Sequence, residues 1–436
     1  MPLGLFGNSE QGWTANLLNL VVMFILFYFL FKFQMYQIVA KMEIAAVKFE
    51  KMANEAKTKV VADCVKRGGK KKKVKKYVDT LADFFVVPPL DADPYGILTK
   101  VEHLLNTSED RFVEASRFML PGEDVEGQAD ISMALKGVVG LNQIAKVVRH
   151  AVEMAKKMKN FQIALIIQMQ LPMLEKMAKG QLEGTKAFLK RFPIGDAIGP
   201  YMAATLSKKK PVEIAEGMML SETTLNKRKI YVLKAMGPGG RVGKPGDAVL
   251  NVLNNHKINR MITVDAAAKM EGEKTGTVAQ GVGVAMGGGV NPERAKIEVI
   301  AQEKKIPIDA IAIKMSIDEA IMPLRGSILN AENDVLEAIS ESLERTPLNS
   351  KILLVGVGNT IGVGNTPDSL KNIASKVKKY DKKRKKELEK KRNKGFRKYL
   401  PEKWKKPLDD DIGAAAPVGM GINARVILSH YMTYLM

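Results

Sequence analysis

Cysteine and histidine are scarce in this chain of 436 residues. Cys64 is the only cysteine, and the four histidines lie in separate regions. A single thiol excludes an internal disulfide framework and any zinc or iron–sulfur site that needs several thiolates from one chain. The scattered histidines argue against a histidine-rich metal centre. Hydrophobic residues make up 46% of the chain, which is enough to form a sizeable buried core. The length of the chain suggests two or three domains.

Acidic residues are rare in two stretches. Residues 66–76 contain eight basic residues and no acidic one, and residues 376–406 contain 17 basic and four acidic residues. These stretches account for the whole formal net charge of +21. We expect 66–76 to contact anionic lipid headgroups, and we expect 376–406 to bind a polyanion, either RNA, the ribosome or anionic lipid. In both cases the alternative is a solvated charged segment.

One long hydrophobic run lies near the N-terminus. Leu17–Phe31 contains a single polar residue, Asn19, and the run extends from Trp13 to Tyr36 with few interruptions. A helix of about 20 mostly apolar residues crosses the hydrocarbon core of a bilayer. The aromatic residues at both ends match the membrane interfaces. We therefore predict a transmembrane helix over residues 15–36, with the lipid bilayer as its partner.

The flanking charges predict the orientation of this helix. Residues 2–16 contain no lysine or arginine, whereas basic residues follow the run. A cleaved signal peptide would need a positively charged leader and a small-residue cleavage site, and neither is present. The positive-inside rule predicts a single-pass protein of the cell membrane, with residues 1–14 outside and the C-terminal bulk in the cytoplasm.

Helical patterns dominate the first half of the chain. Residues 37–78 predict a juxtamembrane helix followed by a basic loop, and residues 79–207 predict a helical domain. Its helices are expected near 96–105, 130–158 and 161–178. The last is very apolar, but its apolar stretch of about 14 residues is shorter than a membrane span requires. We expect it to be a buried helix of a bundle.

Strands and helices alternate in the second half. We expect a linker over 208–229, a Rossmann-like α/β domain over 230–366, and a basic tail or insertion over 367–436. The alternation predicts parallel βαβ units with right-handed crossovers. The expected elements are strands over 230–234, 261–264, 310–313 and 352–357 and helices over 247–256, 292–305 and 331–345.

Glycine-rich segments follow the first and last of these strands. Glycine permits close approach of the backbone to a ligand, and helix N-terminal amides attract phosphate. Neither a Walker A loop nor a dinucleotide fingerprint is present, because Pro238, Val242, Pro245 and Ile361 stand where those motifs need other residues. We predict a phosphate-containing ligand here; the alternative is ordinary connecting turns. The predicted residues are Gly237, Gly239, Gly240, Arg241 and Lys244 after the first strand and Gly356, Gly358 and Asn359 after the last.

A charged loop follows the second strand and includes Asp265, Glu271, Glu273 and Lys274. Carboxylates at a strand end can hold Mg²⁺ beside a phosphate, and the alternative is a solvated, salt-bridged loop. If the first two strands are neighbours, the cations of the first glycine-rich loop face these carboxylates across one crevice. A further turn, Pro193–Pro200, contains an aspartate, Asp196, for which we favour a structural capping role over a ligand contact.

Several segments resemble one known family. They are Asp93–Ile97, Glu102–Leu105, Val147–His150, Pro193–Pro200, Glu271–Gly276 and Ser316–Ala320. They are similar to the uncharacterised archaeal family of domain of unknown function 1512 over about residues 15–366. The resemblance implies an archaeal, membrane-anchored protein and supplies no activity. Residues 367–436 are unlike the usual end of that family.

Two functions fit these features. The first is a single-span membrane protein whose cytoplasmic α/β domain binds a phosphorylated or nucleotide-like ligand, as an enzyme or as a sensor. The alternative is a non-enzymatic membrane tether or scaffold that docks on RNA, the ribosome or anionic lipid through its lysine-rich segments. A homo-oligomer is compatible with either, and no residue can be assigned as an acid, base or nucleophile.

Overall fold

The structure, a computed structural model, describes residues 10–84, 96–158, 161–287 and 291–392. The chain divides into two compact units. Unit 1 consists of Met1–Lys51 and Ile144–Glu175, and unit 2 consists of Met52–Gln143 and Lys176–Met436. The long helices are α1 (Glu10–Lys66), α2 (Lys71–Ala82), α3 (Ile97–Met119), α4 (Val125–Met158) and α5 (Phe161–Leu189). The predicted helices of the first half are present, and each is longer than its predicted range. The expectation that residues 161–178 form a buried helix is wrong for the first part of α5, where Leu165, Ile166, Met169 and Met173 are exposed.

Helix α1 is long and apolar enough to cross a membrane. Its segment Asn16–Lys66 contains a window of mean hydropathy 2.0, and none of that window is buried in the protein. Helix α4 passes the same test of length and composition, but 78% of its apolar window is buried. The apolar side chains of α4 therefore already have protein partners, whereas those of α1 between Leu17 and Phe33 are exposed.

Within unit 1, α1 continues past the apolar run as an amphipathic helix. Met42, Ala46 and Phe49 are buried and recur at the spacing of one helical face. On α4, the guanidinium of Arg149 bonds the carboxylates of Glu43 and Glu50 of α1, at 2.7 Å from Nε to Glu50 Oε1. Unit 1 thus combines an apolar contact with a set of partly exposed ion pairs.

The basic stretch at residues 66–76 differs from the expected loop. Helix α2 begins at Lys71, so half of this stretch is helical. Arg67 is bonded to Asp63, at 2.7 Å, and to Glu123, at 3.1 Å. Lys73 lies over the ring of Phe118, 3.2 Å from its centroid. The proposed contact of this stretch with lipid stays a prediction, and several of its lysines are exposed.

A seven-stranded mixed sheet lies in unit 2, with the strand order β1-β2-β3-β7-β4-β6-β5. Four central strands, β3, β7, β4 and β6, are parallel, and the outer strands run antiparallel to their neighbours. The strands are β1 (Val212–Ala215), β2 (Met218–Leu225), β3 (Arg228–Ala235), β4 (Arg260–Ala268), β5 (Val278–Val282), β6 (Ile308–Met315) and β7 (Lys351–Gly356).

The four predicted strands are confirmed, and they are parallel to one another. The sheet as a whole is mixed, so the prediction of an entirely parallel sheet is wrong. The region expected to be a linker, 208–229, contains β1 and β2, which pair with β3 as an antiparallel extension. Strand β2 contains both buried and partly exposed residues, and its alternation is regular only over Ser221–Thr224. Strand β5 was not predicted, because it lies in a glycine-rich stretch that shows no regular alternation of apolar and polar residues.

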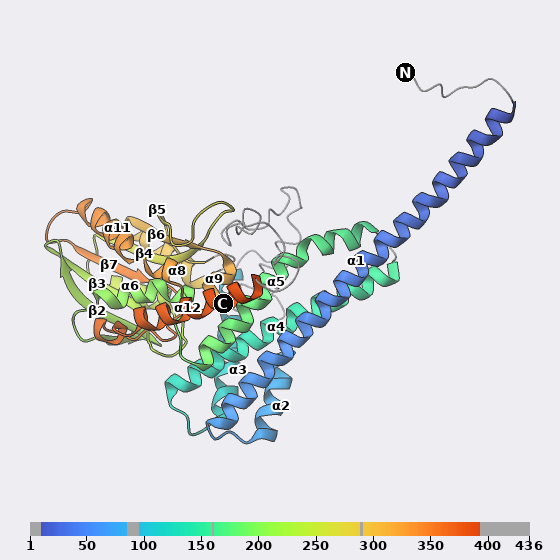
Figure 1. The fold of residues 1–436 in the computed structure, drawn as a ribbon. Coiled ribbons are helices and arrows are strands. Elements are labelled where there is room, and N and C mark those ends of the chain that lie inside the picture. Colours follow the sequence, from blue (N-terminus) through green and yellow to red (C-terminus); the bar gives the residue numbers. More distant parts are fainter. Residues whose placement is uncertain (1–9, 85–95, 159–160, 288–290, 393–436) are drawn as a thin grey trace. The chain divides into compact units, whose positions relative to one another are not determined.

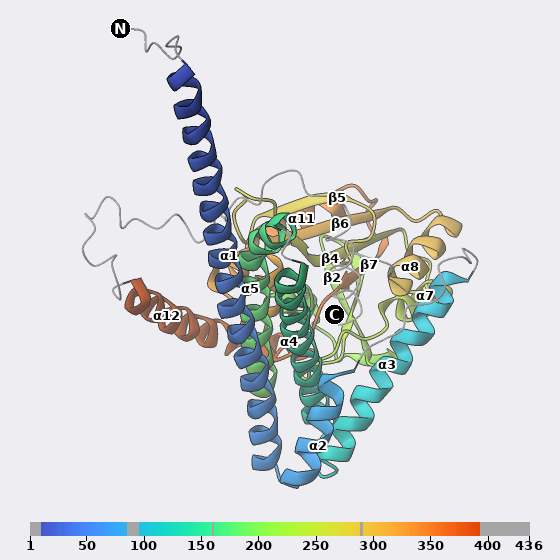
Figure 2. The ribbon, with the colours of Figure 1, turned by 90° about the vertical axis from the view of Figure 1, so that its right-hand side faces the viewer.

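Helices cover both faces of the sheet (Figures 1 and 2). Helices α7 (Pro245–Asn255) and α8 (Pro292–Glu303) pack on one face, and α6 (Ile198–Leu206), α11 (Glu332–Glu344) and the start of α12 (Ile373–Arg392) pack on the other. Successive side chains of β3 alternate between the two cores. The short elements are η1 (Gly195–Ala197), α9 (Ile317–Ile321), α10 (Gly326–Leu329) and η2 (Pro367–Leu370).

Helix α6 lies very close to the ends of two central strands. A Cβ added at Gly199 would stand 2.0 Å from the carbonyl oxygen of Val357 and 2.6 Å from that of Val264. Across the contact, a Cβ at Gly356 would meet the Gly199 carbonyl oxygen at 2.5 Å. Only glycine at both positions allows the two backbones to approach this closely.

We predict that Gly199→Ala lowers the free energy of unfolding by about 1–3 kcal/mol, because the new methyl group meets backbone atoms that cannot turn away. Urea unfolding of the full chain in detergent, followed by circular dichroism, measures the change. Gly281→Ala on the exposed edge strand is the control, since a Cβ there meets nothing within 4 Å. Equal stability of the two variants would contradict the close-approach argument.

Candidate functional site

The glycine-rich loop after β3 donates its amides to other parts of unit 2. Carboxylates accept three of them, and an asparagine accepts a fourth. The bonds run from Gly237 N to Asn365 Oδ1 (2.9 Å), from Gly239 N to Glu126, from Gly240 N to Asp130 Oδ1 (3.1 Å) and from Gly246 N, in the first turn of α7, to Glu293 Oε2 (2.7 Å). Internal oxygen acceptors thus occupy the positions at which a phosphate was predicted.

The two predicted cations of this loop are also paired. Arg241 donates from Nη1 to Glu126 Oε2 at 2.8 Å, and Lys244 donates from Nζ to Glu216 Oε2 at 2.6 Å. The prediction that β3 and β4 are neighbours is wrong, because β7 lies between them. The loop therefore connects the start of α4 to the sheet. It does so with backbone amides and an arginine, the groups with which a phosphate-binding loop would bind phosphate.

A pair of aspartates lies at the carboxyl ends of the parallel strands. Asp265 lies within β4, one residue past the last β4 residue that pairs with β7, and is 4% exposed; Asp196 in η1 is partly buried. Asp196 Oδ2 accepts a hydrogen bond of 2.8 Å from the backbone amide of Asn359, which follows β7. Burial raises the pKa of Asp196 to about 6. Burial, together with the negative charge of Asp196, raises the pKa of Asp265 well above its ordinary value.

Asn359 contacts Asp196 through its backbone amide, and its own side chain is only half satisfied. It is 2% exposed, and its Oδ1 accepts the amide of Ile361 at 2.9 Å. Its Nδ2 has no hydrogen-bond partner among the described residues. A buried donor without an acceptor costs about 1–3 kcal/mol, so an oxygen atom from outside the chain would be bound favourably there.

Lys234 is a second buried titratable group near this edge. Its Nζ donates to the carbonyl of Ala235 at 2.7 Å and to Asn365 Oδ1 at 2.8 Å, both neutral acceptors. Burial lowers the pKa of this lysine to about 7. Asn365 thereby connects Lys234 to the glycine-rich loop, because the same oxygen accepts the amide of Gly237.

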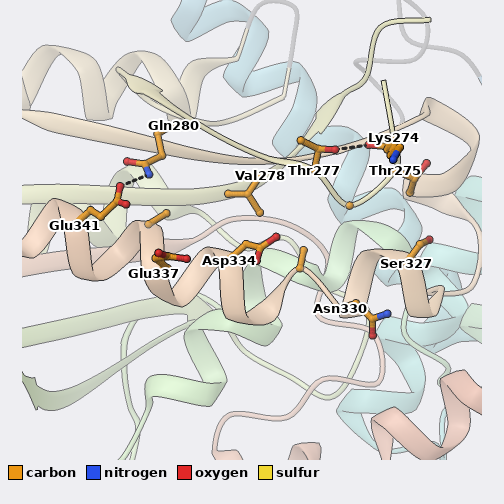
Figure 3. Close-up of a pocket in the computed structure, with 13 residues that line it drawn as sticks. Lys274, Thr275, Thr277, Val278, Gln280, Ser327, Asn330, Asp334, Glu337 and Glu341 are labelled. Atoms are coloured by element: carbon orange, nitrogen blue, oxygen red, sulfur yellow. Dashed lines mark hydrogen bonds between the residues drawn. The ribbon is translucent and has the colours of Figure 1, made fainter. Parts of the chain in front are cut away.

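The remaining predicted residues lie in different places. Glu273 pairs with Lys314 of β6, and Glu271 is exposed. Lys274 lines a surface groove of about 480 Å³ between β5 and α11 (Figure 3). Gly358 stands against Asp196 with a positive φ of 128°, where a Cβ would lie 2.1 Å from the Asp196 carbonyl oxygen.

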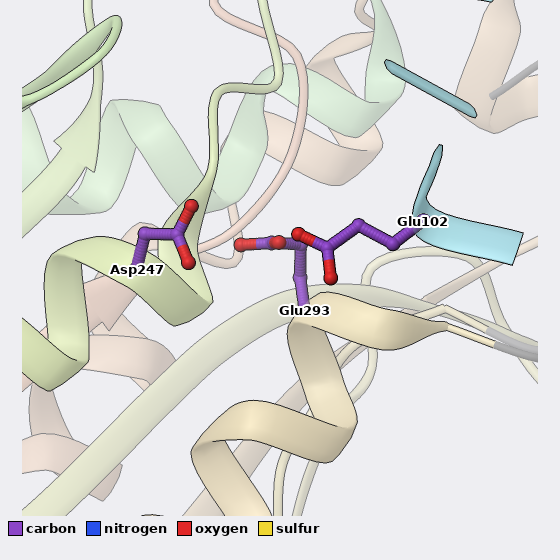
Figure 4. Close-up of side chains that lie close together, drawn as sticks. All are labelled: Glu102, Asp247 and Glu293. Carbon is purple, nitrogen blue, oxygen red and sulfur yellow. The ribbon is translucent and has the colours of Figure 1, made fainter. Parts of the chain in front are cut away.

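Three carboxylates from separate helices meet elsewhere in unit 2. Glu102, Asp247 and Glu293 have oxygen atoms within 4.8 Å of one another (Figure 4). The ammonium of Lys296 lies among them, 2.6 Å from Glu102, 2.6 Å from Asp247 and 3.0 Å from Glu293. The lysine supplies the positive charge that a metal ion would supply, so this cluster is an ion-pair network.

Sequence reasoning selected Asp265, Gly358 and Asn359 but gave Asp196 only a capping role. The glycines and prolines around Asp196 signalled a tight turn, and the turn is present. Its position against the ends of β4 and β7 depends on contacts between distant segments. Lys234 carried no signal in the sequence, because a single lysine ending an apolar strand is ordinary.

Two protein-family models match the chain. The family model of the N-terminal domain of the protein of unknown function DUF1512 matches residues 16–191, and that of the DUF1512 C-terminal domain matches residues 194–364. No curated protein and no solved structure matches the chain. Because the two models together cover most of the sequence, the chain belongs to the DUF1512 family.

We predict that Asp196→Asn changes the pH dependence of stability. The folded pKa of about 6 lies above the ordinary value of 3.8, so native Asp196 holds its proton where the unfolded chain has lost it. Its contribution is present below about pH 4 and is lost as the pH rises through about 6. Relative to the parent, Asp196→Asn should therefore gain up to about 3 kcal/mol between pH 4 and pH 7. Urea unfolding in EDTA across this range tests the gain, with exposed Asp79→Asn as the matched substitution.

Proposed function

We propose that this DUF1512 protein binds a phosphate-containing ligand together with a divalent cation such as Mg²⁺ at the carboxyl edge of its parallel strands. The residues proposed to bind are Asp196, Asp265 and Asn359. The observation that carries the proposal is a pair of interacting buried carboxyl groups, one of them bonded to the backbone amide of Asn359, whose buried side-chain donor Nδ2 lacks a partner among the described residues.

The chemistry of the three groups supports this choice. Two carboxylates in a poorly solvated place repel each other, and a divalent cation removes the repulsion. Mg²⁺ prefers oxygen ligands and is commonly held by one or two carboxylates plus phosphate oxygens. The Asn359 amide would then donate to a ligand oxygen. These residues hold the ligand and the cation, and the proposal includes no reaction.

We also propose that this domain is Rossmann-like. Strands β3, β7, β4 and β6 are parallel and have helices on both faces, as in doubly wound domains. In such domains ligands bind toward the carboxyl ends of the strands. Asp265 lies in the second half of β4, and Asn359 follows the neighbouring strand β7. The outer antiparallel strands are an addition to that pattern.

We also propose that α1 anchors the protein in a membrane, with the bulk of the chain in the cytoplasm. None of the apolar window of α1 is buried by the described part of the chain, so a bilayer would bury side chains that are otherwise exposed. The charge asymmetry of the flanking residues supports the orientation. This places the candidate ligand site on the cytoplasmic side.

A second candidate function is docking on a polyanion through α12. Ile373 and Val377 are buried in the sheet core, and Asp381 Oδ2 accepts the amide of Gly326 at 2.8 Å. Beyond this anchor the helix carries a dense set of exposed lysines, among them Lys382, Lys383, Lys385 and Lys386. A rigid, exposed row of cations suits the phosphate backbone of a nucleic acid. The rest of the predicted segment, 393–406, lies outside the described residues.

We predict that Mg²⁺ with ATP raises the melting temperature of the full chain and that Asp265→Asn abolishes the shift. A ligand at about 100 times its dissociation constant stabilises the native state by about 2.7 kcal/mol. Asp265→Asn keeps the shape of the side chain, removes the buried charge, and should leave the EDTA baseline equal or higher. Thermal unfolding with Mg²⁺ alone, Mg²⁺ plus phosphate, and Mg²⁺ plus ATP makes the measurement.

Glu271→Gln is the control for this experiment, because it removes an exposed carboxylate of the next loop. A normal shift in Asp265→Asn, or an equal loss in both variants, would contradict the proposed site.

For α12, we predict that replacing Lys382, Lys383, Lys385 and Lys386 by glutamine weakens binding to single-stranded RNA and flattens its salt dependence. Each lost phosphate contact lowers the slope of log affinity against log salt by about 0.7 for single strands. Fluorescence anisotropy at several salt concentrations measures the slope. Substitution is preferred to deletion from 376, because deletion removes the buried Val377. An unchanged slope would exclude α12 as the docking surface.

A further inference from the structure

The adjoining ends of α4 and α5 in unit 1 carry exposed apolar side chains. The residues are Met154 and Met158 at the end of α4 and Leu165, Ile166, Met169 and Met173 in the first part of α5. Those of α5 stand three and four residues apart, so they share one face of the helix. We call these six residues the apolar tip. Exposed apolar side chains gathered in one place are typical of a surface that a partner or a bilayer covers.

The exposure is confined to one end of α5. Phe161–Met173 contains no charged residue, whereas Glu175 and Lys176 follow directly. After Met173 the large apolar side chains turn inward, and the buried ones are Leu174, Met177, Leu182 and Phe188. Only the first part of α5 therefore presents apolar side chains outward.

Ion pairs within unit 1 place this end of the two helices beside α1 (Figures 1 and 2). Along α4, Arg149 bonds Glu50 and Glu43, and Lys156 bonds Glu43 at 2.7 Å. The partner on α1 thus moves toward the N-terminus as α4 advances. Helix α4 therefore runs antiparallel to α1, and its end approaches the apolar run of α1.

The pairing of α5 gives the level of the tip along α1. Glu175 of α5 lies 2.5 Å from Lys48 of α1. The 14 residues from Phe161 to Glu175 rise about 21 Å. The same rise along α1 leads from Lys48 back to Gln34, at the end of the apolar run. The start of α5 therefore lies near the level at which the predicted membrane span ends.

Lysines accompany the apolar tip. Lys156 and Lys157 lie in the last turn of α4, and both are exposed. Apolar side chains with lysines beside them are typical of segments in the headgroup layer, where apolar groups face the acyl chains and ammonium groups face lipid phosphates. A second copy of the chain could also cover an apolar face, but it gives no reason for the exposure to end where α5 leaves the level of the membrane span.

We propose that the apolar tip inserts into the headgroup layer of an anionic bilayer beside α1, as a second membrane contact of unit 1. This rests on the proposed anchoring of the chain by α1. A single helix is free to rotate about its own axis in a bilayer. A second contact on one side of it would fix that rotation, and with it the face of unit 1 that meets the lipid.

Quenching by doxyl-labelled lipid tests the proposal on the full chain in vesicles of phosphatidylcholine and phosphatidylglycerol. Met158→Cys and Leu165→Cys, each in a Cys64→Ala background, receive the environment-sensitive fluorophore NBD. We expect blue-shifted emission and several-fold more quenching, by lipid with the doxyl group high on the acyl chain, than for the same label at Lys176→Cys. Lys176 is the matched control, because it is exposed on α5 beyond the apolar part. Circular dichroism verifies that each variant is folded.

A label at Phe27→Cys in α1 separates this proposal from the anchor. Quenching at Phe27 without quenching at the two tip positions would overturn the proposal and leave the anchor standing. No quenching at Phe27 would overturn the anchor and the proposal together. A blue shift at the tip that ignores doxyl lipid and disappears as the protein is diluted in lipid would identify a second copy as the occupant and refute the lipid contact.

A charge placed in the tip gives an independent reading. Ile166→Glu combined with Met169→Glu should lower the quenching at Met158→Cys several-fold, because carboxylates resist transfer toward the acyl chains. Lys176→Glu should leave that quenching unchanged. Equal quenching in the glutamate variant and its parent would contradict insertion of the tip.

Discussion

The close contact between α6 and the ends of β4 and β7 determines most of what is distinctive in this domain. Gly199 and Gly356 bring two backbones together where side chains would normally separate them. The segment that precedes α6 is thereby held against the carboxyl ends of the parallel strands. This is why Asp196, from the end of the helical half, shares a poorly solvated place with Asp265 and Asn359, and why both carboxyl pKa values are raised.

The glycine-rich loop after β3 shows how one set of groups can serve two purposes. Its amides and its arginine are the groups that bind phosphate in many nucleotide-binding loops. Here Glu126 and Asp130 of α4 and Glu293 of α8 accept those hydrogen bonds. The negative charge comes from the chain itself, so the loop connects helices to the sheet and satisfies its own backbone donors.

Charge is distributed on the same principle of local pairing. Lys296 lies among three carboxylates. In the basic stretch 66–76, Arg67 is bonded to Asp63 and Lys73 lies over the ring of Phe118. The exposed lysines of α12 and the carboxylates of the groove beside α11 are different, because both face solvent. These two surfaces carry the charges available for a partner.

The sequence by itself determined the elements whose signal is local. The apolar run of α1, the long helices and the four parallel strands all follow from periodicity and composition. Asp265 and Asn359 were selected for the same reason, since each lies just beyond a readable strand.

The tertiary structure decided strand order and every partnership between distant segments. Nothing local shows that β7 inserts between β3 and β4, or that β1 and β2 extend the sheet where a linker was expected. Two acceptors for the glycine-rich loop, Glu126 and Asp130, come from more than 100 residues earlier in the chain. Such contacts depend on burial, packing and hydrogen-bond satisfaction in the assembled core, and a side chain's own neighbours in sequence do not specify them.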